Sequence, residues 1–352
     1  MSKIYLKAAD LDGYLAQKDK QNIDVMMKKY EQAISIFSDL SGRAGNKEKA
    51  KGKLITLYNE MGKMMQDITK SEDKLHVYSF ETPQPSHGEA SRLIAKLRDV
   101  RTGQPEFIYY IQRAYELLFN FAFARVVPRR KNYIVVSTPV DIPVPNYAVH
   151  KIPSIDKMVA NSVMCVMLRG ALLPSMILSK EIQEYSSNNY VTPFALFKIS
   201  RDDTKDEYNM EYILDLDRSY FNLDLLDGKD LFFADPMNAT GGSLVTVVKY
   251  LLEQGVKPRS VKFFNVVSVL KGSLRIVRAI KDAEIYTLWV DPTLNRLAYI
   301  MPGLGDAGDR INGTDQEENP RNIIQLIAYY GSNIASLYRD QVKEIEGTVL
   351  GK

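Results

Sequence analysis

An aspartate ends an apolar, strand-like run and is followed by a short loop rich in glycine and hydroxyl side chains. The run is Leu231–Ala234, the aspartate is Asp235, and an apolar helical pattern begins near Leu244. The loop between them consists of Pro236, Met237, Asn238, Ala239, Thr240, Gly241, Gly242 and Ser243. Glycines let backbone N–H groups approach an anion, hydroxyls add donors, and the start of a helix favours negative charge. The segment therefore predicts a phosphate site, with Asp235 accepting hydrogen bonds from sugar hydroxyls above it.

The simplest alternative for this loop is a strand-to-helix turn whose shape needs two glycines. A Walker A loop is excluded, because the segment contains no Gly-Lys-Ser or Gly-Lys-Thr sequence. Phosphate binding remains the favoured interpretation, since the aspartate, the hydroxyls and the glycines occur together.

A second glycine-rich segment follows the apolar run 297–301. Its sequence is YIMPGLGDAGDR, residues 299–310, with three glycines and two aspartates in a dozen residues. Such a segment predicts a tight loop whose backbone N–H and C=O groups pair with the edge of a flat heterocycle. A calcium-binding loop is the alternative, but the spacing of the aspartates does not fit an EF-hand.

Strands alternating with helices are expected to position both loops. Short apolar runs rich in Val, Ile, Phe and Tyr occur at 133–136, 163–168, 194–199, 231–234, 261–269, 285–290 and 297–301. Helical patterns lie between several of them, for example at 244–252 and 274–280. Buried strands alternating with helices predict an α/β fold with a mainly parallel sheet. In such folds ligands bind beyond the carboxyl ends of the strands, where both loops are expected.

The two ends of the chain are expected to be helical. Apolar residues at helical spacing, separated by the turn-forming segment 41–46, predict a helical hairpin in the first part. Asn319-Pro320 has the form of a helix start, and an apolar stripe continues from there to about residue 345. The expected parts are a helical extension (1–75), an α/β domain (76–315) and a C-terminal helix (316–352). The polar segment 200–217 is expected to be a loop or an irregular hairpin.

The composition is that of an ordinary globular protein and excludes several classes of function. A net charge of +3 over 352 residues is too small to predict nucleic-acid binding. The single cysteine, Cys165, excludes an internal disulfide, and three widely spaced histidines make a zinc cluster unexpected. The sequence contains no run of about 18 apolar residues, so no membrane span is expected. The first residues lack the apolar stretch of a signal peptide. A reducing, cytoplasmic location is the simplest expectation.

Taken together, the two loops resemble those of the uracil phosphoribosyltransferase family. The sequence DPMNATGGS (235–243) resembles the family's phosphoribosyl pyrophosphate loop, and YIMPGLGDAGDR (299–310) resembles its uracil loop almost letter for letter. Two weaker segments follow in the family's order: LRGALLP (168–174), where the family has Leu-Arg-Ala-Gly, and SRDD (200–203), where it has Tyr-Arg-Asp-Glu. The resemblance covers about 76–315 and implies a type I phosphoribosyltransferase sheet with a uracil-binding hood.

The resemblance also implies roles for individual residues. Residues Asp235 to Ser243 would bind phosphoribosyl pyrophosphate, with Thr240 to Ser243 on its 5′-phosphate. Arg169 and Arg201 would contact the pyrophosphate, because a guanidinium pairs with phosphate through two parallel hydrogen bonds. The remaining implied contacts are Ile300, Gly305, Asp306 and Ala307 for uracil, and Asp306 with Tyr299 for phosphoribosyl pyrophosphate. Asp235, Arg169 and Arg201 are the implied catalytic residues.

The implied reaction joins uracil to phosphoribosyl pyrophosphate, giving UMP and pyrophosphate with Mg²⁺ as cofactor. Homo-oligomers are also implied, and the terminal helices would widen a subunit interface. The alternative is a phosphoribosyltransferase core kept as a nucleotide-sensing or scaffold domain; a weaker one is an enzyme that uses another base. A basic cluster around Pro128 either binds an anionic effector nucleotide or forms a solvated turn, which is favoured. Its members are Arg125, Arg129, Arg130 and Lys131.

Overall fold

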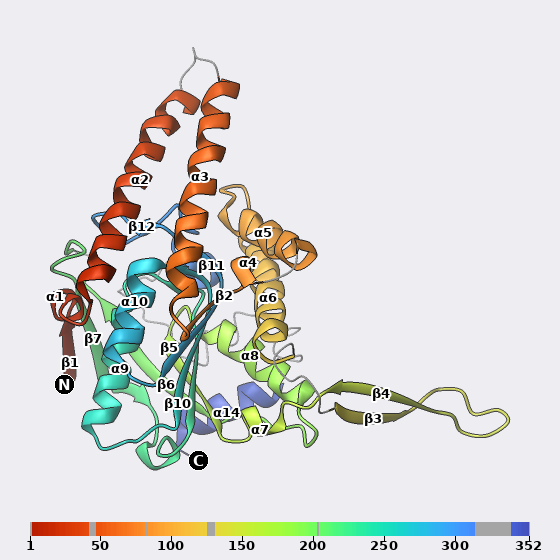
Figure 1. The fold of residues 1–352 in the computed structure, drawn as a ribbon. Helices are drawn as coiled ribbons and strands as arrows, with labels where there is room; N and C mark the ends of the chain where they lie inside the picture. Colours follow the sequence, from red (N-terminus) through yellow and green to blue (C-terminus); the bar gives the residue numbers. More distant parts are fainter. Residues whose placement is uncertain are drawn as a thin grey trace.

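The protein is an α/β structure with one large twisted sheet and helices on both faces (Figure 1). We describe it from a computed structural model, which covers residues 2–41, 47–81, 84–124, 131–202, 204–313 and 339–351. The expected fold class is confirmed, because the centre of the sheet is parallel and its strands alternate along the chain with helices.

The large sheet has the strand order β1-β7-β6-β5-β8-β10-β11-β2, and β9 pairs with β10. The pairs from β6 to β2 along this order are parallel, whereas β7 is antiparallel to both β6 and β1. Its strands are β1 (Lys3–Lys7), β2 (Leu75–Val77), β5 (Ser162–Leu168), β6 (Phe194–Arg201), β7 (Glu211–Tyr220), β8 (Asp230–Ala234), β9 (Met237–Asn238), β10 (Ser260–Val269) and β11 (Ala283–Asp291).

The central strands are apolar throughout because both faces of the sheet are covered. Every residue of β5 and β8 is buried. On one face, Phe232 and Phe264 pack against Phe123, with ring centroids 5.5 to 5.9 Å apart. That face carries α4 (Tyr78–Glu81), α5 (Gln84–Arg98), α6 (Gln104–Phe119), the π-helix η1 (Asn120–Ala124) and α8 (Leu172–Tyr185). The other face carries α9 (Gly242–Glu253) and α10 (Leu270–Ala279).

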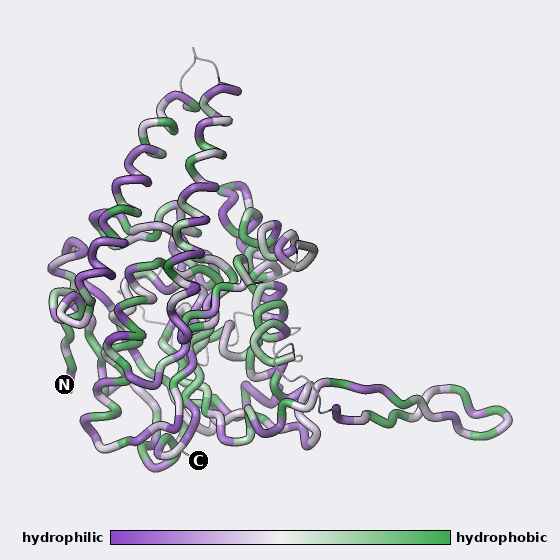
Figure 2. Tube along the Cα trace, viewed as in Figure 1, coloured by the Kyte–Doolittle hydropathy of each residue, from purple (hydrophilic) through white to green (hydrophobic). Residues whose placement is uncertain are grey.

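The first residues of the chain, expected within a helical extension, form an edge strand instead. β1 pairs with β7 over residues 3–7, and its alternation of exposed and half-buried side chains fits an edge strand. The short α1 (Ala8–Asp12) follows. The expected helical hairpin is present as α2 (Gln17–Ser41) and α3 (Lys47–Lys70), which extend away from the sheet (Figure 1). Figure 2 shows hydrophobic and hydrophilic residues alternating along both helices.

The run 133–136, expected as a buried strand of the sheet, belongs to a separate exposed hairpin. β3 (Lys131–Ser137) pairs antiparallel with β4 (Tyr147–Pro153), and the two form an arm that projects from the body (Figure 1). Tyr133, Val135 and Val149 are each more than 60% exposed. The expectation of burial was wrong because an apolar run of this length has the same composition in either setting.

Residues 293–312 form a small unit beside the large sheet, which we call the hood. β12 (Thr293–Leu294) and β13 (Ile300–Met301) pair antiparallel, and α11 (Ala307–Asn312) follows. At 200–217 the hairpin alternative holds, since β6 and β7 pair with a register shift. The C-terminal helix is described as α14 (Arg339–Leu350), whereas its expected start at 319–320 lies outside the described residues. Short helices are α7 (Asp156–Val159) and η2 (Leu223–Leu225).

No helix in the described ranges combines the length and the apolar character that crossing a membrane requires. Arg125, Arg129 and Arg130 lie outside the described residues, so the interpretation of the basic cluster remains a prediction.

Candidate active site

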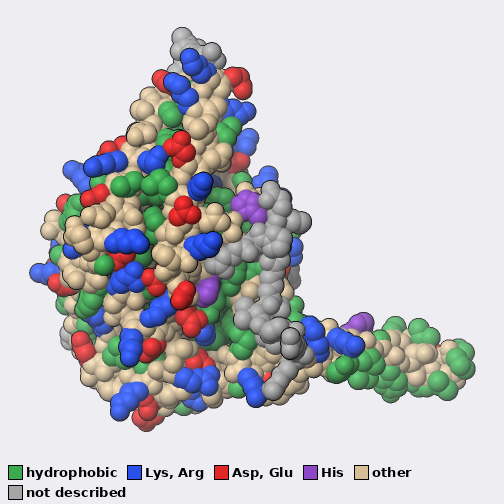
Figure 3. Space-filling model, viewed as in Figure 1, with side chains coloured by type: hydrophobic (Ala, Val, Ile, Leu, Met, Phe, Trp, Pro, Cys, Tyr) green, Lys and Arg blue, Asp and Glu red, His purple; other side chains and the backbone are tan. Residues whose placement is uncertain are grey.

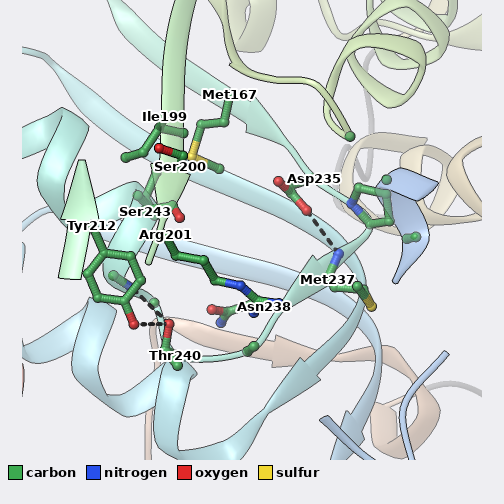
Figure 4. A pocket seen from close by; sticks show the side chains of 18 of the residues that line it. Met167, Ile199, Ser200, Arg201, Tyr212, Asp235, Met237, Asn238, Thr240 and Ser243 are labelled. Carbon is green, nitrogen blue, oxygen red and sulfur yellow. Dashed lines mark hydrogen bonds between the residues drawn. The ribbon is translucent and has the colours of Figure 1, made fainter. Parts of the chain in front are cut away.

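A cavity of about 250 Å³ opens at the carboxyl ends of β5, β6 and β8, where ligand sites are expected in this kind of sheet. It brings together segments that are far apart in the sequence (Figure 4). Its lining consists of residues 167–170, 199–201, 235–244 and 306–308, together with Tyr212 and Phe263. The first glycine-rich loop and residues 306–308 of the second therefore line one cavity.

The loop 239–243 has the geometry of a phosphate cradle. Gly241 adopts a left-handed backbone (φ 77°) immediately before α9, a conformation that favours glycine. A Cβ on Gly241 would lie 2.8 Å from the carbonyl oxygen of Gly272, so the loop packs directly on α10. The backbone amides at the start of α9 line the cavity and carry the positive end of the helix dipole. This end of the cavity is suited to an anion.

Asp235 lies at the end of β8, half-buried against the cavity, and one of its oxygens accepts a hydrogen bond from the Met237 backbone N–H at 3.1 Å. The pKa of its carboxyl group is raised to about 7, because desolvation by burial and the charge of Asp306 raise the pKa by more than the Met237 N–H lowers it. A donor or cation placed between the two aspartates would stabilise both negative charges. Sugar hydroxyls are donors of this kind, so the position of Asp235 is suited to bind them.

Tyr212 is a member of the site that the sequence analysis missed. Its hydroxyl donates to Thr240 Oγ1 at 2.5 Å (Figure 4), and its ring fills the space beside Gly242, where a Cβ would approach within 3.0 Å. Tyr212 comes from β7, which lies in the segment expected to be a loop or irregular hairpin. The available signal was the pair Tyr212 and Leu214, two large apolar residues two positions apart that are both buried, since a period of two indicates a strand with one covered face.

The two predicted arginines both line the cavity, but they differ in what holds them. Arg201 extends into the cavity (Figure 4), and its guanidinium lies 5.2 Å from the ring centroid of Tyr299. Arg169 instead donates to Asp309 Oδ1 at 2.9 Å and to the carbonyl oxygen of Gly313 at 2.7 Å. Arg169 thus ties the end of β5 to the hood. Asp203, the last residue of the segment SRDD, lies outside the described residues.

The swapped order Arg169-Gly170-Ala171 places Gly170 against the hood. A Cβ on Gly170 would lie 3.4 Å from the Cα of Gly308, which is ordinary van der Waals contact. Ala171 adopts an ordinary helical backbone at the start of α8 (φ −81°). Neither the space around Gly170 nor the backbone angle of Ala171 therefore requires glycine, and the swap is compatible with this turn.

The residues predicted as substrate contacts in the segment 299–310 are only partly in the cavity. Asp306 and Ala307 line it, whereas Tyr299, Ile300 and Gly305 are not among the described lining residues. Asp306 caps α11, because its side chain accepts a hydrogen bond from the Asp309 N–H at 2.9 Å. Gly305 adopts a left-handed backbone (φ 77°), which turns the loop immediately before Asp306.

Two further residues hold this loop in place. Asp291, at the end of β11, accepts a hydrogen bond from the Gly303 N–H at 3.0 Å and one from Arg98 at 2.6 Å. Arg310 donates to the carbonyl oxygens of Leu304 (2.8 Å) and Thr102 (3.1 Å). Hydrogen bonds from the loop's backbone to Asp291 and from Arg310 to the loop's backbone therefore hold the loop in place.

A Mg²⁺ ion would have to share its ligands with a substrate at this site. In the described ranges there is no group of three histidine, cysteine, aspartate or glutamate side chains that would hold a metal by itself. Asp235 and Asp306 offer two carboxylates that interact electrostatically, and Mg²⁺ in proteins is commonly bound by one or two carboxylates together with substrate phosphates. The donor set fits a magnesium–pyrophosphate complex.

The geometry agrees with what comparison of the sequence with known proteins finds. Residues 187–314 match the uracil phosphoribosyltransferase family. This segment includes β6, the hood and the loop 235–244, which we call the phosphate loop. Curated uracil phosphoribosyltransferases are similar to the chain over part of it: that of Limosilactobacillus fermentum is 44% identical over 86 residues, covering 24% of this chain and 41% of that protein. That of Campylobacter concisus is 46% identical over 80 residues, covering 23% and 38%.

The chain thus spans about two fifths of the length of the curated relatives it matches. Among solved structures, a protein of Aquifex aeolicus is 21% identical with a TM-score of 0.45, covering 66% of this chain and 97% of that one. Orotate phosphoribosyltransferase of Mycobacterium tuberculosis, in complex with 5-phospho-alpha-D-ribosyl 1-diphosphate, is 13% identical with a TM-score of 0.30, covering 61% and 95%.

Proposed function

We propose that this protein is a uracil phosphoribosyltransferase, which converts uracil and phosphoribosyl pyrophosphate to UMP and pyrophosphate in pyrimidine salvage. The observation that carries the proposal is the shared cavity, which the phosphate loop at 235–244 and the hood residues 306–308 line together. A site for one substrate at each end of one cavity is what a transfer between them requires.

In the proposed reaction a ring nitrogen of uracil attacks the anomeric carbon of the ribose, and the bond from that carbon to pyrophosphate breaks. The nitrogen loses its proton, and positive charge develops on the sugar in the transition state. Catalysis consists mainly of positioning: the loop 239–243 holds the 5′-phosphate and Asp235 accepts hydrogen bonds from ribose hydroxyls. Arg201 and Arg169 stabilise the charge of the leaving group, as positioned cations do.

For Arg169 this role requires an exchange of partners. Its guanidinium contacts Asp309 and the Gly313 carbonyl oxygen, so the incoming pyrophosphate would have to compete with both acceptors. A doubly charged phosphate is a stronger acceptor for guanidinium than a neutral carbonyl. When bound with the pyrophosphate, Mg²⁺ would supply neutralisation of negative charge, with Asp235 and Asp306 as the residues that would hold it.

The choice of base tests the proposal most selectively. Backbone N–H groups would donate to the carbonyls of uracil and a backbone C=O would accept from its ring N–H. In cytosine an amino group replaces one carbonyl, so a donor would face a donor and polar groups of the site would be left unpaired. We expect a preference for uracil on the order of 10⁴. Competition among uracil, cytosine, adenine and hypoxanthine, with nucleotide products separated chromatographically, measures it. Equal use of cytosine or a purine would contradict uracil as the substrate.

One observation favours a second candidate function, a nucleotide-binding domain that senses or scaffolds without turnover. Arg169, an expected pyrophosphate contact, is held by Asp309 and by the carbonyl oxygen of Gly313. If these contacts persist when substrate is present, the pyrophosphate half of the site stays closed. A protein that binds UMP tightly and forms no UMP from uracil would belong to this class.

A homo-oligomer and a cytoplasmic location are further parts of the proposal. The β3–β4 arm exposes apolar side chains at consecutive positions of β3, hence on both its faces, and Figure 3 shows apolar side chains along the visible side of the arm. A two-stranded hairpin alone is at best marginally stable in water. A second subunit would cover it. The single cysteine is buried, which fits a reducing compartment. Nucleotide effectors of such an oligomer remain an expectation, to be tested by activity measurements with added nucleotides.

A further inference from the structure

The phosphate loop is in contact with the beginning of the chain through one buried side chain. Arg275 of α10 is fully buried (0% exposed). Its Nε and Nη2 atoms donate to Asp12 Oδ1 at 2.9 and 2.7 Å, and Nη2 lies 3.0 Å from Glu207 Oε1. Its remaining nitrogen, Nη1, donates to the carbonyl oxygen of Thr240 at 3.4 Å. The buried arginine of α10 therefore joins two other segments, those of Asp12 and Glu207, to the loop.

Asp12 and Glu207 are what make this burial possible. A buried guanidinium without partners is strongly unfavourable, so its place in the fold depends on the two carboxylates. Glu207 also pairs with Lys271 at 2.8 Å, so it shares its charge between two cations. The Asp12 side chain makes two hydrogen bonds to Arg275 and remains 29% exposed. Asp12 therefore fixes the direction in which Arg275 points.

The contact with Thr240 has a direct consequence for the anion-binding amides. The Thr240 carbonyl and the Gly241 N–H belong to one peptide unit, and in a trans peptide these two groups point in opposite directions. Arg275, by binding the carbonyl oxygen from the α10 side, directs the Gly241 N–H to the other side of the loop. Gly241 and Gly242 line the cavity, so that side faces the expected 5′-phosphate.

We infer that Arg275 is a positioning residue for phosphoribosyl pyrophosphate, and that Asp12 of the N-terminal segment sets its orientation. The inference rests on the proposed function for its substrate. Residues 1–12 lie outside the matched segment 187–314, and the sequence shows no reactive group pattern there. The structure nevertheless places the start of the chain under the phosphate loop, where β1 and α1 pack on β7 and α10.

The test compares Asp12→Asn with Asp10→Asn. Asp10 lies in the same short helix but is exposed, so it is the matched control. Asp12→Asn removes the charge that holds Arg275, and we expect the Kd for phosphoribosyl pyrophosphate with Mg²⁺, measured calorimetrically without uracil, to rise about five- to tenfold. Its KM should rise in parallel, while kcat and the KM for uracil stay within about twofold. Asp12→Glu, which keeps the carboxylate, should restore most of the affinity.

Thermal unfolding of each variant separates positioning from a loss of folded protein. The inference is overturned if Asp12→Asn binds phosphoribosyl pyrophosphate as the parent does. It is also overturned if Asp10→Asn loses as much affinity, or if kcat and both KM values change together with the folded fraction. Because binding is measured without turnover, a parent that binds phosphoribosyl pyrophosphate and makes no UMP sinks the proposed function alone. A parent that does not bind it contradicts both.

Discussion

At Asp235 a single carboxyl group determines how the cavity interacts with a sugar. Burial raises its pKa to about 7, so at neutral pH the group is divided between its neutral and charged forms. The sequence predicted the residue and its neighbours, because an acid between a buried strand and a glycine loop is a local pattern. It did not predict the raised pKa, because that depends on packing from other segments and on Asp306 in the hood.

The affinity for phosphoribosyl pyrophosphate should therefore depend on pH through Asp235. The ionised carboxylate accepts hydrogen bonds from ribose hydroxyls, so affinity should fall as pH decreases through about 7, the pKa of this group. The Kd for phosphoribosyl pyrophosphate, measured between pH 5.5 and 8.5, checks this. In Asp235→Asn the Kd should be higher by about tenfold or more at pH 8, since hydrogen bonds to a charged group contribute roughly 1.5–3 kcal/mol. A variant with the parent's Kd and pH profile would remove Asp235 from the site.

The same substitution, which should weaken binding, should raise the stability of the folded state at pH 8. The folded carboxyl keeps its proton up to about pH 7, whereas the unfolded one ionises near 3.8, so the folded state binds the extra proton between these values. The free energy of unfolding should then fall as pH rises through this window. Asp235→Asn removes that loss, and we expect it to be more stable than the parent at pH 8 by about 1 kcal/mol or more. Urea unfolding of the parent and of Asp235→Asn at pH 4.5 and pH 8 measures the difference. If the two proteins are equally stable at both pH values, burial does not penalise the charge of Asp235.

Gly305 offers a second test at the residue scale. Its φ of 77° is strained for any other residue, whereas a Cβ there would meet only Arg310 Cδ at 3.7 Å. Gly305→Ala should therefore act through the backbone by turning the amides that precede Asp306. We expect a loss of uracil affinity of about tenfold, with phosphoribosyl pyrophosphate affinity unchanged. Gly228→Ala, with φ 68° and open space around it, is the matched control for strain alone. A similar loss in the control would refute a role of this loop in reading the base.

Helix α10 and the phosphate loop act as one element, although about thirty residues separate them. The sequence predicted the loop and the strands around it, since β5, β6, β8, β10 and β11 coincide closely with the apolar runs. It did not predict that Gly272 lies against Ala239 or that Arg275 lies under Thr240, because such contacts require the tertiary fold. The same holds for Tyr212, which reaches the loop only because β7 pairs with β6.

Gly272→Ala should disturb the loop without touching the cavity. A Cβ at this position would come within 3.0 Å of the Ala239 backbone, which cannot move aside cheaply. We expect a loss of stability of about 1–3 kcal/mol from overpacking, together with weaker binding of phosphoribosyl pyrophosphate. Gly62→Ala on α3 is the control, because nothing lies within 4 Å of its Cβ and alanine favours a helix by roughly 0.5–1 kcal/mol. Denaturant unfolding and calorimetry of both variants provide the measurement. If Gly272→Ala is as stable as the parent, the close packing of α10 on the loop is wrong.

At the scale of the whole molecule, the sequence patterns predicted the first strand, β1, and the projecting arm β3–β4 least well. The strand β1 was missed because a strand of five residues directly before a helix gives too short a pattern. The run 133–136 of the arm was assigned to the sheet because a continuous apolar run of this length is typical of a buried strand. The first error concerns whether an element forms and the second where it packs; both depend on pairing partners that are distant in the sequence.

The arm gives the whole-molecule prediction. Replacing residues 134–150 by a short Gly-Ser turn removes exposed apolar side chains and leaves the cavity untouched, since none of its described lining residues lies in the arm. We expect the variant to sediment as a smaller species than the parent at equal concentration. Substituting Val135 and Val149 by threonine, which keeps the β-branched shape, is the milder companion. If parent and variants sediment alike, the arm does not form a subunit contact.

Formation of UMP tests the central claim most directly. The full chain is incubated with uracil, phosphoribosyl pyrophosphate and Mg²⁺, and the nucleotide and pyrophosphate products are quantified over time. The account predicts equal amounts of UMP and pyrophosphate, with rates that saturate in both substrates, and little product when Asp235→Asn replaces the parent. Because the two loops share one cavity, omission of either substrate should leave no pyrophosphate release above background. A parent protein that binds UMP and phosphoribosyl pyrophosphate but forms no UMP would contradict the account.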